Sequence, residues 1–212
     1  MFTQFSKLRS GAILLALIAG LALIVGSTPA AGAEEEVYRA FAVNMGSFGP
    51  AGATTLDIHI TRWSTEEERQ KLYTALMENG HEEFIKLLRK EKETGWGRFQ
   101  GRIQTANPFP STRIRYAHQE VVDGERQITL ITDRPIGMRE AMSGNRSRDY
   151  DTTAILLQMP QESAGDEGAK DGKGKGTLYL ALKPEWDKKN SKLKLEEWGN
   201  EPIRLTTVNR VK

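Results

Sequence analysis

The residues of this chain with the most chemical potential are histidines and aspartates that alternate with apolar residues. Asp57 and His59 lie two positions apart in TTLDIHITRW, and His118 stands in RIRYAHQEVV. Residues two apart in a strand share one face, so on neighbouring strands these groups could converge as a metal or hydrolase site. With Asp133 added, Asp57, His59 and His118 are the candidate catalytic residues. The simpler interpretation is a solvated strand face, which carries the same residue types without any activity.

A second candidate site lies in the segment TDRPIGMREAMSGNRSRDYD, residues 132–151, between two predicted strands. Arg134 and Arg148 could bind an anionic ligand there, because a guanidinium group forms two parallel hydrogen bonds to one carboxylate or phosphate. The alternative, which we favour, is an ion-paired loop that closes one end of the β-structure. The candidate ligand-binding residues of this segment are Arg134, Arg148, Asp149 and Tyr150.

Several known catalytic and metal-binding motifs are absent from the sequence. His81-Glu82-Glu83 does not begin a zinc-binding HExxH motif, because Ile85 stands where the second histidine is required. The chain contains no cysteine, which excludes a thiolate nucleophile, a thiolate metal site and any disulfide. The segment GAKDGKGKGT lacks the Ser or Thr that follows GK in a phosphate-binding loop. We therefore expect no metal and no cofactor, and a binding protein rather than an enzyme.

The candidate side chains lie on segments whose periodicity is that of β-strands. Leu56, Ile58 and Ile60 alternate with polar residues, which predicts a half-buried strand, paired antiparallel with VYRAFAVNM. Asp123-Gly124 separates two β-rich runs and predicts a hairpin with a type I′ turn. The runs TAILLQM, GTLYLALK, SKLKLEEW and PIRLTTV predict four further strands in an antiparallel meander. The polar, Gly-rich residues 161–176 between the first two runs predict a surface loop.

A helical hairpin interrupts the predicted strands over residues 64–92. Ser64 stands three residues before Glu67, the spacing of a capping box, and Asn79-Gly80 provides a stop signal. A second helix is predicted over residues 82–91. The fold class is therefore mainly β: an antiparallel β-barrel or β-sandwich of about eight or nine strands with an inserted helical hairpin. Either arrangement buries the alternating apolar faces.

The first 33 residues have the features of a cleavable signal-peptide helix. Lys7 and Arg9 precede an apolar run from Ala12 to Val25, and Ala31-Gly32-Ala33 supplies the small residues of a cleavage site. The apolar run is shorter than the roughly 20 residues that a membrane-spanning helix needs. We therefore expect residues 34–212 to form a single β-rich domain in the periplasm or outside the cell, which contacts a membrane only transiently, during export.

The charge of the predicted mature chain argues against a nucleic-acid partner. Lys7 and Arg9 are two of the 30 basic residues, and no acidic residue precedes Glu34. Cleavage after Ala33 would leave 28 basic and 28 acidic residues, so the excess positive charge belongs to the leader. A nucleic-acid-binding domain normally carries a clear excess of positive charge.

Two segments are the most distinctive in the chain: RWSTEEER at residues 62–69 and TDRPIG at residues 132–137. With RAFAVNM, VVDGERQITLITDRPIG and EPIRLTTV, they resemble a family of uncharacterised exported bacterial proteins, and the resemblance extends over nearly the whole predicted mature chain. It implies a bacterial secreted or periplasmic context and implies no particular activity.

These observations favour an exported, non-enzymatic β-domain that binds a small ligand or a protein of the cell envelope. One alternative is a hydrolase or metal-dependent enzyme that uses the histidines and aspartates of the strand faces. A second alternative is a structural protein associated with the envelope.

Overall fold

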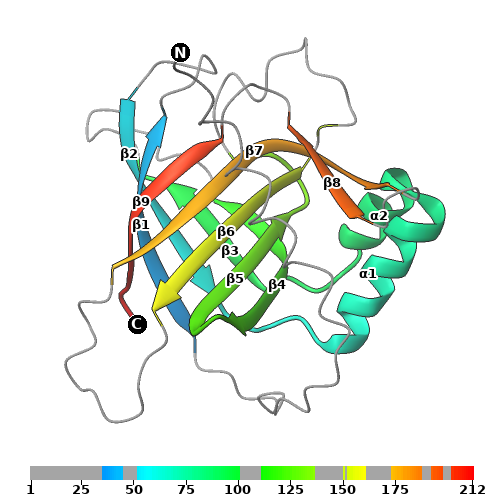
Figure 1. The fold of residues 1–212 in the computed structure, drawn as a ribbon, viewed down its shortest axis with the longest axis horizontal. Helices are drawn as coiled ribbons and strands as arrows, with labels where there is room; N and C mark the ends of the chain where they lie inside the picture. The colour runs from blue at the N-terminus through cyan, green and yellow to red at the C-terminus, as the bar shows by residue number, and fades with distance from the viewer. Residues whose placement is uncertain are drawn as a thin grey trace, which may run out of the picture.

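The computed structural model describes residues 35–44, 52–100, 111–136, 150, 152–160, 173–187, 192–197 and 202–212. Within these ranges the chain forms nine strands and two helices (Figure 1). The strands are β1 (Glu36–Asn44), β2 (Gly52–Ile60), β3 (Gly95–Phe99), β4 (Thr112–Val122), β5 (Glu125–Thr132), β6 (Thr152–Pro160), β7 (Gly174–Asp187), β8 (Lys192–Glu197) and β9 (Ile203–Arg210). The helices are α1 (Glu66–Asn79) and α2 (His81–Leu88). The predicted signal peptide lies outside the described residues.

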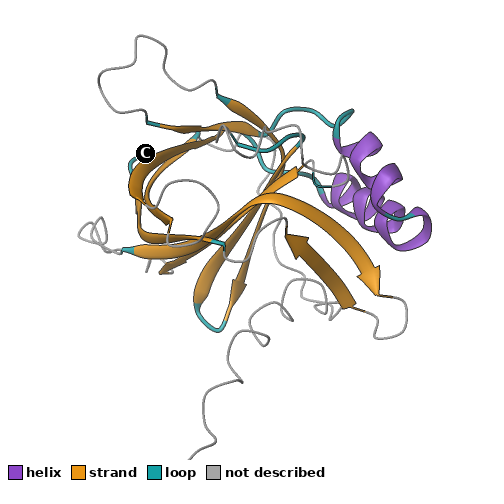
Figure 2. Ribbon diagram, turned by 90° about the horizontal axis from the view of Figure 1, so that it is seen from above, coloured by secondary structure: helices purple, strands orange, loops and turns teal. Residues whose placement is uncertain are grey.

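Eight of the strands close into an antiparallel barrel. The ring runs β1-β2-β3-β4-β5-β6-β7-β9 and returns to β1, because β9 pairs with both β7 and β1. Figure 2 shows the strands curving round, with both helices together on one side of them. The structure thus confirms the mainly β fold with an inserted helical hairpin and identifies the β-structure as a barrel. Closure leaves no unpaired edge around the ring.

The last four strands do not form the predicted meander. β7 is 14 residues long. Its first part pairs with β9 and its last part pairs with β8, so β8 lies outside the ring. β9 follows β8 in the chain but pairs with β7 and β1 instead, and these two pairings complete the ring.

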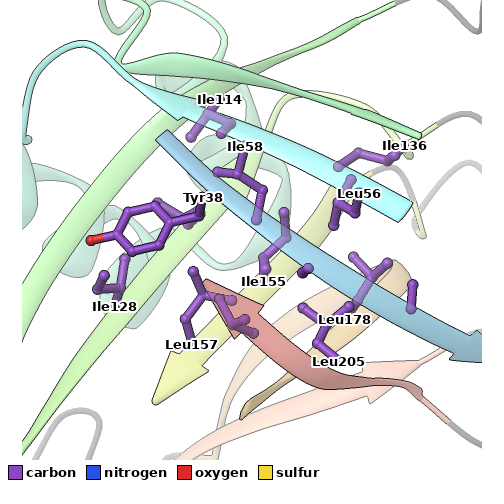
Figure 3. Packing of buried hydrophobic residues seen from close by; sticks show 14 of the residues in the cluster. Tyr38, Leu56, Ile58, Ile114, Ile128, Ile136, Ile155, Leu157, Leu178 and Leu205 are labelled. Carbon is purple, nitrogen blue, oxygen red and sulfur yellow. The ribbon is translucent and has the colours of Figure 1, made fainter. Parts of the chain in front are cut away.

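The barrel interior is filled by apolar side chains from every strand of the ring. Most of these side chains are large, but β1 contributes two small ones, Ala40 and Ala42. An eight-stranded barrel has an interior just wide enough for side chains to fill. Figure 3 shows part of this cluster, whose labelled members are Tyr38, Leu56, Ile58, Ile114, Ile128, Ile136, Ile155, Leu157, Leu178 and Leu205.

Strand β7 begins inside the segment whose composition predicts a loop. The loop was predicted over residues 161–176, of which 161–172 lie outside the described residues, but β7 already starts at Gly174. A β-carbon at Gly176 would collide with the carbonyl oxygen of Leu156 on β6. Glycine at this position allows the backbones of β6 and β7 to approach closely. The glycine therefore belongs to a strand, although a glycine-rich sequence usually indicates a loop.

Helix α1 has a capping box, but it is one residue later than predicted. The backbone N–H of Glu68 donates to the Thr65 hydroxyl at 3.2 Å, and the Thr65 N–H donates to the Glu68 carboxylate at 2.9 Å. Ser64 instead pairs with β4: its N–H donates to the Ala117 carbonyl oxygen at 2.8 Å, and its hydroxyl accepts from the Ala117 N–H at 3.1 Å. The prediction of Ser64 as the cap is therefore wrong.

The helical hairpin covers part of the outer face of the barrel. Leu72 and Leu76 of α1 pack with Phe84, Ile85 and Leu88 of α2. Tyr116 of β4 and Ile131 of β5, which point away from the barrel interior, pack against this helical cluster. Among the described residues no helix is both long enough and apolar enough to cross a membrane.

The predicted hairpin between β4 and β5 is confirmed. Asp123 and Gly124 have φ angles of 53° and 76°. A type I′ turn requires positive φ at both central residues, which Asp-Gly tolerates better than most dipeptides. The predicted pairing of β1 with β2 is also confirmed, over the whole length of both strands.

Candidate functional site

An open groove of about 510 Å³ lies on the outer face of β5, β6, β7 and β9, four neighbouring strands of the ring (Figure 1). We call it the outer groove. Its volume is within the range of about 300–1,000 Å³ that is typical of ligand sites. The barrel interior is packed with apolar side chains, so the outer groove is the better candidate for a binding site.

Strand register places the side chains of the outer groove in two rows across the strands. The first row consists of Thr129 on β5, Leu156 on β6, Thr177 on β7 and Arg204 on β9, each directly opposite the next. In the second row Gln127 faces Gln158, and Gln158 faces Lys175. These positions alternate along each strand with core positions, so the side chains of both rows point outward. The first row spans about 14 Å, at roughly 4.8 Å for each strand spacing.

Two cations lie at one side of the outer groove. Lys175 precedes Thr177 by two residues on β7, and Arg204 faces Thr177 from β9. In a regular ladder, diagonal neighbours of this kind have Cα atoms about 7–8 Å apart; here the β7–β9 register shifts at Lys175, between Gly174 and Gly176. Two long side chains this near each other can reach one shared ligand. Both residues are exposed, and neither forms an ion pair with another residue in the described ranges.

The remaining lining of the outer groove is neutral. Thr129, Thr177 and Thr206 supply hydroxyl groups, and Gln127 and Gln158 supply amides. No aspartate, glutamate or histidine is among the described lining residues. The arrangement can therefore attract and hydrogen-bond an anion, because no carboxylate of the described lining neutralises the two positive charges. The described lining residues include no aspartate, glutamate or histidine that could act as a general acid or base near neutral pH.

Asp57, one of the candidate catalytic residues, is held in an ion pair on the outer face of β2. Its carboxylate accepts hydrogen bonds from Arg39 Nε at 2.9 Å and from Gln100 Nε2 at 2.6 Å. Burial by itself raises the pKa of Asp57, but the hydrogen bonds from Gln100 and Arg39 outweigh burial and lower the pKa below its usual value. Asp57 therefore stays ionised and is a weak proton acceptor.

His59 lies on the same face as Asp57 but has different partners. Its ring stacks on the Trp96 ring of β3, with centroids 3.7 Å apart and an interplanar angle of 15°. Its Nδ1 atom lies 3.2 Å from a carboxylate oxygen of Glu35. The Arg98 guanidinium also lies over the Trp96 ring, 5.6 Å from its centroid.

The structure does not bring the four candidate catalytic residues together. His118 is on β4, and β3 separates β4 from β2, the strand that carries Asp57 and His59. Asp133 follows β5 and pairs with Arg115, whose Nε lies 2.9 Å from its carboxylate. Among the described residues no group of three or more His, Cys, Asp or Glu side chains could hold a metal ion.

The candidate ligand-binding residues of segment 132–151 are only partly described. Arg134 is exposed and Tyr150 is half-buried, whereas Arg148 and Asp149 lie outside the described residues. The described part, residues 132–136, contacts the barrel through a hydrogen bond and a buried side chain. The Ile136 N–H donates to the Thr153 hydroxyl at 2.9 Å, and the Ile136 side chain is 1 % exposed within the core. These contacts support the interpretation of this part as a loop that closes one end of the barrel.

The distinctive RWSTEEER segment also has a structural role. Arg62 donates to both carboxylate oxygens of Glu68, at 2.9 and 3.1 Å, and to the carbonyl oxygens of Lys92 and Glu93 at 2.8 and 3.2 Å. One side chain thus joins the end of β2, the start of α1 and the segment that leads into β3. We find no ligand-binding geometry there.

Sequence reasoning missed the outer groove. Alternation in GTLYLALK and PIRLTTV indicates which residues share a face of β7 or β9, but it does not indicate that these strands are neighbours. Lys175 could not be assigned to a strand face from the sequence, because it lies in the segment whose composition predicts a loop. Comparison of the chain with protein families, with curated proteins and with solved structures gives no match.

Proposed function

We propose that this protein is exported to the periplasm or the extracellular space and binds an anionic ligand in the outer groove without transforming it. The observation that carries the binding proposal is the pair Lys175 and Arg204. Both are exposed, both line one cavity, and no acidic residue described in its lining neutralises them. Two such cations form charge-assisted hydrogen bonds to one anionic group, which are roughly twice as strong as neutral hydrogen bonds.

The binding proposal is tested by isothermal titration of the purified protein with sulfate, phosphate and acetate. The double variant Lys175→Met/Arg204→Met should bind the best of these anions about tenfold more weakly or worse, a loss of about 1.4 kcal/mol or more. Methionine keeps the unbranched apolar length of both side chains and removes the charge.

The matched control is the double variant Lys90→Met/Arg134→Met. It also removes one lysine and one arginine, both exposed and outside the outer groove. Its affinity should equal that of the wild type. If the control loses binding and the groove variant does not, the anion binds at Lys90 or Arg134 and the outer groove is not the site.

Export is supported by the basic start, the apolar run and the small residues of the first 33 positions. The test is to express the whole chain in a bacterium, fractionate the cells and determine the N-terminal residue. We expect a periplasmic or secreted product that begins at Glu34, and retention of the Leu17→Arg variant, because a charge in the apolar run prevents insertion. A full-length wild-type protein in the cytosol would exclude export.

A further inference from the structure

We infer that the ligand of the outer groove is a carboxylated oligosaccharide, a short chain of uronic acid sugars, an inference that rests on the proposed anion site. The cations account for only one side of the outer groove. The rest of the lining indicates what else the ligand must carry.

The neutral side of the outer groove offers both hydrogen-bond donors and hydrogen-bond acceptors to the body of a ligand. Gln127 and Gln158 face each other across β5 and β6, and each amide has two donor hydrogens and an acceptor oxygen. Thr129 and Thr177 add hydroxyls in the next row. Sugar hydroxyl groups satisfy such a surface. A hydrocarbon chain would form no hydrogen bond with these groups, so it would use only the apolar part of the lining.

The outer groove also has apolar surface that an inorganic anion would not use. Leu156 lies in the middle of the first row, between Thr129 and Thr177. Beyond the β9 side lies Phe41 of β1, which is 46 % exposed. Its carbonyl oxygen accepts from the hydroxyl of Thr206, a lining residue, at 3.4 Å. Sugar rings present apolar C–H faces, which pack on such residues while the hydroxyl groups at the ring edge bond to polar neighbours.

Size and charge limit the ligand further. A cavity of about 510 Å³ is much larger than one phosphate or sulfate and matches a ligand of a few rings. Two cations match a ligand with one or two anionic groups in the groove. A nucleic acid carries a charge at every nucleotide and calls for a longer basic track.

The test compares four probes by titration calorimetry: trigalacturonic acid, its fully methyl-esterified form, sulfate and octanoate. We expect trigalacturonic acid to bind at least tenfold more tightly than each of the other three. The Lys175→Met/Arg204→Met variant should lose this preference for the acid over its methyl ester, because it removes the charges that recognise the carboxylates.

Two further variants test the neutral and apolar sides of the outer groove. Gln127→Ala/Gln158→Ala and Phe41→Ala should each weaken trigalacturonic acid binding about fivefold or more and leave sulfate affinity unchanged. Gln70→Ala, which removes an exposed amide on α1, is the control and should change neither affinity. Unchanged melting temperatures will show that the variants are folded.

The outcomes separate this inference from the anion site on which it rests. If sulfate binds at Lys175 and Arg204 but trigalacturonic acid binds no more tightly, the oligosaccharide inference is wrong and the anion site stands. Tighter binding of octanoate overturns the inference in favour of an amphiphilic anion. If no probe binds, both the inference and the proposed function fail.

Discussion

Arg126 holds together a buried polar cluster at one end of the barrel interior. Its guanidinium donates to both carboxylate oxygens of Glu36, at 2.9 and 3.0 Å, and to the Tyr38 hydroxyl at 3.0 Å. Burial raises the pKa of Glu36, but the hydrogen bonds from Arg126 and Tyr38 outweigh it and hold the pKa below its usual value. Burial, together with the neighbouring Glu36, raises the pKa of Tyr38 well above its usual value. The cluster is therefore an ion pair at neutral pH with a neutral tyrosine.

Replacing Arg126 with methionine should destabilise the protein by about 3 kcal/mol, because the buried Glu36 carboxylate loses its hydrogen-bonded cation and keeps only Arg210, whose Nε lies 3.7 Å away. Urea unfolding measures this loss. The control is Lys86→Met, which breaks an exposed ion pair with Glu83 on α2 and should change stability by about 0.5 kcal/mol at most. A loss for Arg126→Met as small as that of the control would show that Glu36 is solvated.

His118 gives the fold a predicted dependence on pH. Helix α1 covers it, with Glu66 and Arg69 facing it, and its β4 neighbours on the same face are Tyr116 and Glu120. Burial, and next the charge of Arg69, lower the pKa of His118 below its usual value of about 6.5. The unfolded chain then binds more protons at this residue than the folded chain. The stability that neutral His118 contributes is fully present above about pH 6.5, the pKa of the unfolded chain. It is lost as the pH falls from there through the lower pKa of His118 in the folded chain.

The variant His118→Gln should therefore lose less stability than the wild type between pH 7.5 and pH 5.5. Urea unfolding at several pH values measures the slope. Gln70→Ala, which changes an exposed residue of α1 and removes no titratable group, is the control and should keep the wild-type slope. Glu120 acts in the opposite sense at lower pH, since burial raises its pKa and its protonation favours the folded state. Equal slopes for wild type and His118→Gln would refute the assignment.

At the scale of elements, the start of α1 shows how tertiary contacts select one of two residues that fit the capping-box pattern equally well. Ser64 and Thr65 each precede a glutamate by three residues, so the capping-box spacing fits both. The hydrogen bonds of Ser64 to Ala117 on β4 occupy its hydroxyl, and this leaves Thr65 to cap the helix. A strand about 50 positions away in the chain thus decides where the helix begins.

Replacing Thr65 with alanine should destabilise the protein by about 1 kcal/mol, because the Glu68 N–H loses its acceptor. Thr65→Ser keeps the hydroxyl and should cost much less. Thermal unfolding followed by circular dichroism measures both. A serine variant as unstable as the alanine variant would mean that the threonine methyl group, and not the cap, stabilises the helix.

At the scale of the whole molecule, stability depends on closing the barrel at both ends as well as around its ring. Arg126 and Glu36 fill one end, and Ile136 enters the core from the segment after β5. The Thr153 hydroxyl holds this segment by accepting from the Ile136 N–H, while it donates to the Leu180 carbonyl oxygen at 2.7 Å. The TDRPIG segment therefore joins β5, β6 and β7.

Replacing Ile136 with alanine should destabilise the protein by about 2–5 kcal/mol, through lost burial and the cavity left behind. Ile136→Val should cost about 0.5–1.5 kcal/mol. The control is Val121→Ala, since Val121 is 57 % exposed and should contribute about 0.5 kcal/mol or less. If Ile136→Ala were as mild as the control, the segment would not close the barrel.

The sequence by itself determined the local elements: β2 from alternation, the β4–β5 turn from Asp123-Gly124, and the helical hairpin from its start and stop signals. These signals are local, because side-chain periodicity and turn chemistry act within a few residues. Only the tertiary structure decided that β9 returns to β1, that β8 stays outside the ring and that Lys175 and Arg204 meet in one groove. Those outcomes depend on pairing between strands far apart in the chain, and the free energy of that pairing comes from filling one shared core.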